Sequence, residues 1–150
     1  MVGWRLVKAR LAARAFSGEG ARLHGGRWSS PGTSVVYVSE TLSLAALEVL
    51  VHVQSSGLLT SYVTCRVEFD SDWSSVIDRA SLPSDWRTSP APAELRAIGD
   101  DWVRERRSLL LKVPSAIVPL EHHCLINPAH PDFARLTIGP PEPFMFDTRL

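Results

Sequence analysis

A chain of 150 residues can form one domain with a buried core and is too short for two comfortable ones. Its hydrophobic fraction of 45% and charged fraction of 21% argue against an intrinsically disordered chain. Sixteen lysines and arginines balance sixteen aspartates and glutamates. This neutrality argues against a protein that binds nucleic acid by neutralising phosphates.

The first half of the chain opens with a short predicted strand over residues 4–9. Two glycine-containing turns are expected next, at residues 17–20 and at residues 25–26. A proline–glycine turn at residues 31–32 then leads into a strand over residues 34–38, which is rich in β-branched and aromatic side chains.

The middle of the chain predicts a helix, a strand and a long loop. Thr41 is a suitable cap for a helix over residues 42–53, and Gly57 marks its end. Apolar and polar residues then alternate over residues 59–69, which indicates a half-buried strand. The Ser-, Asp- and Pro-rich stretch over residues 70–92 predicts a loop with about one turn of helix.

The last third predicts a helix over residues 93–106, because its apolar residues have helical spacing. Apolar strands are expected over residues 109–113 and 116–120, and a last strand over residues 144–146. Strands and helices do not alternate regularly along the chain, so the pattern favours an α+β fold over a doubly wound sheet.

Localisation and metal content follow from what the sequence lacks. No apolar run approaches the roughly 20 residues that a membrane-spanning helix needs, and arginines interrupt the N-terminal stretch where a signal peptide would be apolar. Cys65 and Cys124 show neither metal-ligand spacing nor a disulfide framework, and the five histidines form no convincing ligand set. We therefore expect a cytoplasmic protein with no membrane association and no metal site.

The predicted helix over residues 42–53 carries a candidate catalytic group. All its residues except Ser43, Glu48 and His52 are apolar, so we expect the helix to be buried nearly all round. An ionised carboxylate in such surroundings is costly unless it is paired. Glu48 is therefore either one partner of a salt bridge, with His52 or an arginine, or a carboxylate that faces a cleft.

The sequence GGRW contains a candidate anion site. The Arg27 guanidinium offers a rigid fork of donors suited to phosphate or carboxylate, while Gly25 and Gly26 allow backbone N–H groups to approach an anion. The alternative is an arginine stacked on a neighbouring aromatic. Tyr37 is either a core aromatic or a platform for a ligand, and Ser115 after a proline is either a turn residue or a ligand contact.

Three motifs extend this interpretation. The stretch GEGARLHGGRWSSPGTSVVYVSETLSLAALEVLVH, residues 18–52, resembles the signature of the RES domain, which is named for its Arg, Glu and Ser. The stretch VPSAIVPLEHHCLINPAHPDF resembles a second block of this family, and FDTRL resembles its usual ending. Ser29 and His123 depart from the pattern, because the family usually has Asn at both positions. If either Asn positions the ligand, the activity of this chain is altered or weakened.

The resemblance covers residues 1–150 as one RES domain and implies mixed β-sheets with a few helices, similar to ADP-ribosyltransferases. It implies a toxin of a bacterial toxin–antitoxin pair that consumes NAD⁺ as a substrate, by hydrolysis or phosphorolysis at the nicotinamide–ribose bond, without a prosthetic group. The catalytic positions carried over are Arg27, Tyr37, Glu48 and Ser115, and the nucleotide-binding positions are Gly25, Gly26, Arg27 and Tyr37.

The resemblance also implies a partner: an Xre-type helix-turn-helix antitoxin that covers the active site, with a toxin homodimer allowed within the complex. This chain itself would not contact nucleic acid. Three alternatives to NAD⁺ degradation stay open. They are an ADP-ribosyltransferase that modifies a protein, a ribonuclease toxin, which the neutral charge disfavours, and a non-catalytic binding module with a decayed site.

Overall fold

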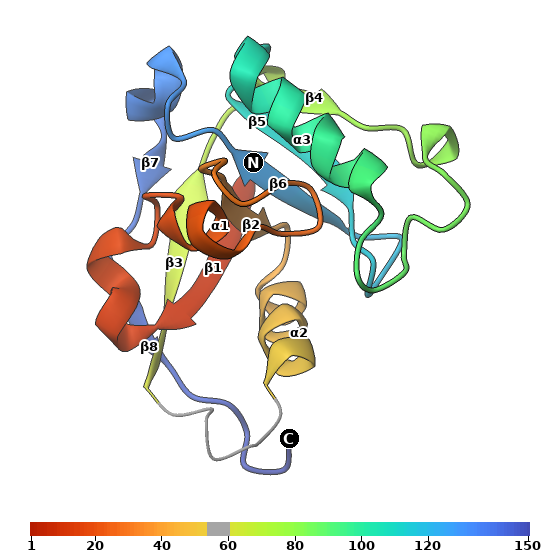
Figure 1. Cartoon of the computed structure of the whole chain (residues 1–150). Coiled ribbons are helices and arrows are strands. Elements are labelled where there is room, and N and C mark those ends of the chain that lie inside the picture. Colours follow the sequence, from red (N-terminus) through yellow and green to blue (C-terminus); the bar gives the residue numbers. More distant parts are fainter. Residues whose placement is uncertain (54–60) are drawn as a thin grey trace.

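The strands join in one mixed sheet, which we describe from a computed structural model for residues 1–53 and 61–150 (Figure 1). The strand order is β4-β5-β6-β2-β1-β3-β7, with β8 beside β3. The strands are β1 (Val2–Lys8), β2 (Val36–Ser39), β3 (Tyr62–Glu68), β4 (Ser74–Val76), β5 (Leu110–Pro114), β6 (His122–Ile126), β7 (Thr137–Ile138) and β8 (Glu142–Phe144). Only β4 and β5 pair in parallel among the described strands.

Few helices accompany this sheet in the part of the chain that the structure describes. The α-helices are α1 (Glu19–His24), α2 (Leu42–His52) and α3 (Ala93–Glu105). Short 3₁₀ segments are η1 (Ala9–Arg14), η3 (Ser71–Trp73), η4 (Arg79–Ser81) and η5 (Pro131–Arg135). This combination of a mixed sheet and few helices confirms the predicted α+β class. No helix in the described segments has both the length and the hydrophobicity needed to cross a membrane.

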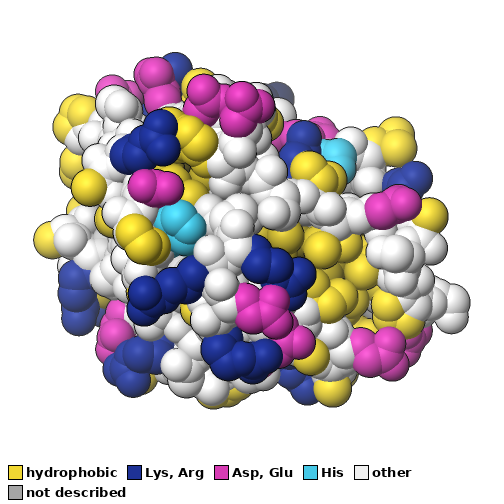
Figure 2. Space-filling view, turned by 90° about the horizontal axis from the view of Figure 1, so that it is seen from above, with side chains coloured by type: hydrophobic (Ala, Val, Ile, Leu, Met, Phe, Trp, Pro, Cys, Tyr) yellow, Lys and Arg dark blue, Asp and Glu magenta, His cyan; other side chains and the backbone are white. Residues whose placement is uncertain are grey.

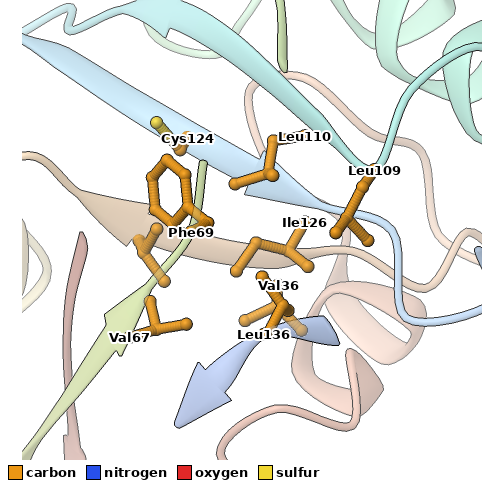
Figure 3. Close-up of a cluster of buried hydrophobic side chains, with 9 residues drawn as sticks. Val36, Val67, Phe69, Leu109, Leu110, Cys124, Ile126 and Leu136 are labelled. Atoms are coloured by element: carbon orange, nitrogen blue, oxygen red, sulfur yellow. The ribbon is translucent and has the colours of Figure 1, made fainter. Parts of the chain in front are cut away.

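Alternation along the central strands divides the core between the two faces of the sheet. Val36 on β2, Leu110 on β5 and Ile126 on β6 belong to one buried cluster (Figure 3). Their sequence neighbours point the other way: Leu111 and Leu125 pack with the α3 residues that cover the opposite face. Since successive side chains in a strand face opposite sides, Tyr37, Ser39 and His123 also lie on the α3 side.

Close packing of α3 fixes the GGRW segment. A Cβ on Gly99 would lie 1.6 Å from the carbonyl oxygen of Trp28, so only glycine lets α3 approach this backbone. Asp100 on the same helix accepts a hydrogen bond from the backbone N–H of Ser30 at 2.9 Å. The Trp28 side chain is 1% exposed. The loop that carries Arg27 is therefore anchored immediately after that residue.

Helix α2 begins where the sequence predicts but is less buried. The hydroxyl of Thr41 accepts a hydrogen bond from the backbone N–H of Leu44, which confirms the predicted cap. The expectation that this helix is buried nearly all round is wrong, because the sheet contacts one side of it, through Leu44 and Ala45. Leu47 and Val51 are 39% and 63% exposed.

Other boundaries differ from the predictions. A strand over residues 116–120 is wrong: these residues form a turn that the Ser115 side chain caps, and the strand lies at β6 instead. The last strand ends at Phe144 instead of starting there. Helix α1 was not expected, and it begins at Glu19, within the turn predicted over residues 17–20. The predicted helix end at Gly57 and the first two residues of the predicted strand over residues 59–69 lie outside the described residues.

Candidate active site

A cavity of about 1200 Å³ opens on the α3 side of the sheet. Its walls come from β1, the segment from α1 through the GGRW turn, β2, α2, and the loops around residues 87–91 and 116–117. This volume exceeds the roughly 300–1,000 Å³ that is typical of sites for drug-sized ligands. The cavity is therefore large enough to hold an extended ligand.

Most of the site residues predicted from the sequence meet in this cavity. The residues that line it include Gly25, Gly26, Arg27, Tyr37 and Glu48. Three consecutive segments of the chain supply them: the turn after α1, strand β2 and helix α2.

Ser115 lies behind the cavity wall. Its side chain is fully buried, and its hydroxyl oxygen accepts hydrogen bonds from the backbone N–H groups of Ile117 and Val118, both at 3.1 Å. Ile117 and Ala116 line the cavity, whereas Ser115 is not among the residues that do so in the described chain. The structure therefore places Ser115 one layer away from the other predicted residues.

Glu48 is paired with a histidine that the sequence did not single out as its partner. Its Oε1 atom lies 2.7 Å from Nε2 of His123, whose Nδ1 lies 3.0 Å from the hydroxyl of Ser39. His52, one of the two kinds of partner expected from the sequence, instead places its Nδ1 2.7 Å from the backbone carbonyl oxygen of Glu48. Burial acts to raise the pKa of Glu48, but the hydrogen bond and charge of His123, with His52 and Arg27, leave that pKa below its usual value. The carboxylate is therefore ionised at neutral pH.

Tyr37 is held in place by the GGRW turn. Its hydroxyl accepts a hydrogen bond from the backbone N–H of Trp28 at 3.2 Å and lies 2.8 Å from the hydroxyl of Ser29. A Cβ on Gly26 would lie 2.6 Å from this hydroxyl, so glycine is needed for the turn to rest on the ring. Burial is the main cause that raises the pKa of Tyr37, which keeps the phenol protonated at neutral pH.

Arg27 has no carboxylate partner among the described residues. Its Nη1 donates hydrogen bonds to the carbonyl oxygens of Trp86, at 3.0 Å, and Thr88, at 2.7 Å. Burial lowers the pKa of Arg27, and the nearby charge of Glu48 acts in the opposite direction. The guanidinium is thus held by neutral carbonyl groups, which leave its positive charge available to a ligand.

Three further arginines line the cavity and also donate to backbone carbonyl groups, and the sequence analysis did not identify them. Arg5 donates to the carbonyl oxygens of Ala15 and Tyr37, Arg87 to that of Ala116, and Arg96 to that of Ala91. Burial lowers the pKa of Arg5 to about 10. Among the described lining residues Glu48 is the one acidic side chain. The cavity therefore combines several unneutralised cations with a single carboxylate.

The two departures from the RES pattern both fall within this site. Ser29 contacts the hydroxyl of Tyr37, and His123 contacts the carboxylate of Glu48. Each replaces an Asn of the usual signature with another hydrogen-bonding side chain. The departures were visible in the sequence, but the side chains that they contact were not.

The described residues contain no group of three or more His, Cys, Asp or Glu side chains placed to hold a metal ion. Cys65 and Cys124 are both buried as free thiols. Burial raises the pKa of the Cys124 thiol to about 11, so this thiol is not an activated nucleophile.

The sequence of this chain is similar to those of a known protein family. A family model described as "RES domain" matches residues 3–147. The chain belongs to the RES domain family. Within this family, "Toxin Res" of Yersinia enterocolitica is 38% identical over 151 residues, covering 100% of this chain and 99% of the relative. "Toxin Res" of Photorhabdus laumondii is 41% identical over 134 residues, covering 89% of this chain and 85% of the relative.

A third relative carries a more specific name, and a solved structure shares the fold of this RES domain. "Prs ADP-ribosylating toxin" of a Sphingobium species is 34% identical over 152 residues, covering 98% of this chain and 94% of the relative. A chain in the crystal structure of the MbcT–MbcA toxin–antitoxin complex of M. tuberculosis aligns with a TM-score of 0.76 at 18% identity. The alignment covers 96% of this chain and 84% of that chain, so the two proteins share the fold over nearly their whole length.

Proposed function

We propose that this RES domain is the toxin of a toxin–antitoxin pair and that it cleaves NAD⁺ at the bond between nicotinamide and ribose. The observation that carries the proposal is the charge arrangement of the cavity. One ionised carboxylate, Glu48, lies among arginines that have no acidic partner in the described chain. A dinucleotide supplies the two features that such a site would recognise, namely an anionic pyrophosphate and a ribosyl carbon that becomes cationic during cleavage.

The chemistry requires one carboxylate. Nicotinamide is cationic in NAD⁺, so it takes both electrons of the breaking N–C1′ bond and leaves as a neutral molecule without being protonated. The ribosyl group acquires oxocarbenium character, which an anionic Glu48 stabilises more strongly in the transition state than in the ground state. Water then adds to C1′ and loses a proton to give ADP-ribose, whereas inorganic phosphate gives the corresponding phosphate ester. Ordinary glycosidases need a second carboxyl group to protonate their leaving group.

The other residues would bind and orient the substrate. Arg27 would exchange its carbonyl partners for oxygens of the pyrophosphate, which accept the guanidinium fork more strongly because they are charged. Tyr37, fixed by Ser29 and Trp28, would present its ring to nicotinamide or ribose. Ser115 would act through the turn that it caps, because its hydroxyl is already engaged by two backbone N–H groups.

A product analysis tests this proposal. Purified protein is incubated with NAD⁺ and phosphate, nicotinamide release is followed by chromatography, and the second product is identified by mass spectrometry. Free ADP-ribose or its phosphate ester supports degradation of NAD⁺. ADP-ribose attached to a protein instead indicates transfer, the activity that the name of the Sphingobium relative suggests. Intact NAD⁺ after incubation with folded protein would overturn the proposed degradation.

The proposed partner is a cognate antitoxin of the Xre helix-turn-helix type that covers the cavity. Val51 lines the cavity and Leu47 lies on the same helix, and both apolar side chains are well exposed. A protein that covered the opening of the cavity would bury these two side chains. We expect expression of this chain alone to deplete NAD⁺ and stop growth, and co-expression of the antitoxin to restore both. Normal growth and normal NAD⁺ with abundant folded protein would contradict the assignment as a toxin.

A further inference from the structure

A buried hydrogen-bonded chain supports Glu48 from behind. Ser39 on β2 and His123 on β6 occupy directly paired positions of the sheet, and both side chains face the cavity side. Their residues are 4% and 8% exposed. Nε2 of His123 lies 2.7 Å from Oε1 of Glu48, and Nδ1 lies 3.0 Å from the Ser39 hydroxyl. The consecutive elements β2 and α2 thus meet the distant strand β6 in one line of contacts.

The chemistry of these groups fixes the direction of the hydrogen bonds. An ionised carboxylate only accepts, so Nε2 of His123 must carry a proton and donate it to Glu48. In the neutral imidazole the other nitrogen is then an acceptor, and the Ser39 hydroxyl donates to it. The carboxylate of Glu48 therefore sets the tautomer of His123, and the Ser39 hydroxyl satisfies the remaining ring nitrogen. A protonated His123 would still donate from Nε2 to Glu48, and its Nδ1 would then donate to the Ser39 hydroxyl.

We infer that His123 is a positioning residue for the reaction, which holds Oε1 of Glu48 so that Oε2 is presented to the ribosyl carbon, and that the contact with Ser39 fixes the orientation of the imidazole. This inference rests on the proposed cleavage of NAD⁺. The described residues give Oε2 no hydrogen-bond partner, and Glu48 lines the cavity. A group that fixes the orientation of a reacting side chain commonly governs its efficiency, because small displacements from the productive geometry lower the rate steeply.

A charge on His123 would act directly on Glu48, because the two side chains are in contact. Protonation would place a positive charge beside Oε1 and offset part of the negative charge that stabilises the oxocarbenium ion. The other charged groups near Glu48 are His52, from its own helix, and Arg27, from the GGRW turn. Next to His123 on its own strand, His122 is engaged elsewhere, with Glu40 at 3.6 Å.

Four variants test the inference through the rate of NAD⁺ loss, measured as kcat and KM over a range of pH. We expect His123→Ala to lower kcat by about 10- to 100-fold with KM nearly unchanged. His123→Asn should recover most of this loss, because its amide N–H can donate to Glu48. The decline of kcat at acidic pH should be weaker in His123→Asn than in the wild type, because Asn does not acquire a charge. Ser39→Ala should lower kcat by a smaller factor, and His122→Ala, the matched control, should leave it unchanged.

The results separate a positioning role from a structural one. A merely structural histidine would lower the melting temperature without changing the pH profile of kcat, and that result overturns the inference. Wild-type kcat in a folded His123→Ala variant also overturns it. So does a kcat of His123→Asn that is no higher than that of His123→Ala. If His123→Ala does not fold, the comparison of His123→Asn with the wild type decides, through the pH profile.

A second measurement does not depend on activity. Nitrogen-15 NMR of the histidine side chains should show a proton on Nε2 of His123, both in the wild type and in Ser39→Ala, because Glu48 remains the acceptor. An Nδ1–H tautomer in the wild type would overturn the inference. The wild type could instead show the expected tautomer and leave NAD⁺ intact. That result would disprove the proposed reaction, and with it the positioning role, but not the hydrogen bonds between Ser39, His123 and Glu48. The failures of the two proposals are thereby distinguished.

Discussion

The arginines that line the cavity differ from those on the outer surface in what they bind. Several outer arginines pair with an acidic residue close in the sequence: Arg22 with Glu19, Arg66 with Glu68, Arg104 with Asp101, Arg107 with Glu105, Arg135 with Asp132 and Arg149 with Asp147. Acidic and basic side chains accordingly lie beside one another on the face shown in Figure 2. The four cavity arginines instead donate to backbone carbonyl groups.

This difference separates charges that are balanced within the protein from charges that are available to a ligand. An exposed pair between near neighbours adds little stability, since water and salt screen it. A carbonyl partner orients a guanidinium without neutralising it, and a phosphate can displace the carbonyl because a charged acceptor binds more strongly. The cavity arginines are therefore expected to affect ligand binding, and the surface arginines are not.

The largest expected effect is that of Glu48→Gln, which removes the one acidic side chain of the described cavity wall. Gln has nearly the same size, so the fold should persist, but the charge that we propose to stabilise the oxocarbenium ion is lost. By analogy with deletion of one oxyanion-hole donor, we expect kcat to fall by about 10²- to 10³-fold with little change in NAD⁺ affinity. The rate of NAD⁺ loss, measured beside a binding titration, checks this. A folded Gln variant that turns over NAD⁺ at the wild-type rate would leave Glu48 with only a structural role.

Arg27 should differ from a surface arginine in its response to lysine. We expect Arg27→Lys to be nearly as damaging as Arg27→Ala, with a loss of about 10- to 100-fold in kcat/KM, because lysine keeps the charge but loses the two-pronged geometry. Arg104→Lys, in an exposed pair with Asp101, is the matched control and should not change kcat/KM. If Arg27→Lys retained wild-type kcat/KM, Arg27 would supply charge without specific geometry.

A smaller effect is expected for Gly26→Ala. The added Cβ would lie 2.6 Å from the Tyr37 hydroxyl and 2.8 Å from its Cζ atom, so the ring or the turn must move. We expect about a tenfold fall in kcat/KM, consistent with the displacement of an aligned substrate contact. Gly20→Ala is a matched control inside α1, because its Cβ would meet nothing within 4 Å. Equal activities of the two variants would show that the contact of Gly26 with Tyr37 does not matter for the reaction.

The smallest effect concerns stability and pH. Because the pKa of Glu48 is lower in the folded protein than in the unfolded chain, its ionised form stabilises the fold at neutral pH. That contribution is lost as the pH falls through the folded-state pKa. We expect Glu48→Gln to lower the free energy of unfolding by about 1 kcal/mol or less at pH 7, since the group is partly exposed. Denaturant titrations should show this difference shrinking as the pH falls below the usual range of glutamate. A difference that grew at low pH would contradict the sign of the pKa shift.

Local signals in the sequence predicted much of the fold. The Thr41 cap and the helix start at residue 42 depend on neighbouring residues, and the structure has both. Arg27, Tyr37 and Glu48 were identified because the motif that contains them is compact, and they line one cavity. The predicted strand over residues 116–120 failed because the Ser115 side chain competes with strand pairing by binding the next backbone N–H groups.

The missed features depend on contacts between distant segments. Gly99 has no distinguishing neighbours in the sequence, and only the approach of α3 to Trp28 explains it. The contact of His123 with Glu48 joins β6 to α2, and no spacing rule relates two residues so far apart. The alternation of HHCLI could have placed His123 on the same face as Leu125, but the partner strand was needed to place Ser39 opposite it.

We propose that the guanidinium of Arg27, which has no acidic partner in the described chain, binds the pyrophosphate of NAD⁺. The most direct test is calorimetric titration of the Glu48→Gln protein, with and without Arg27→Ala, using NAD⁺ and nicotinamide riboside, which lacks the pyrophosphate. Arg27→Ala should weaken NAD⁺ binding by about tenfold or more, which corresponds to one charge-assisted hydrogen bond, and should leave nicotinamide riboside binding unchanged. Equal losses for both ligands, or no loss for NAD⁺, would contradict the claim.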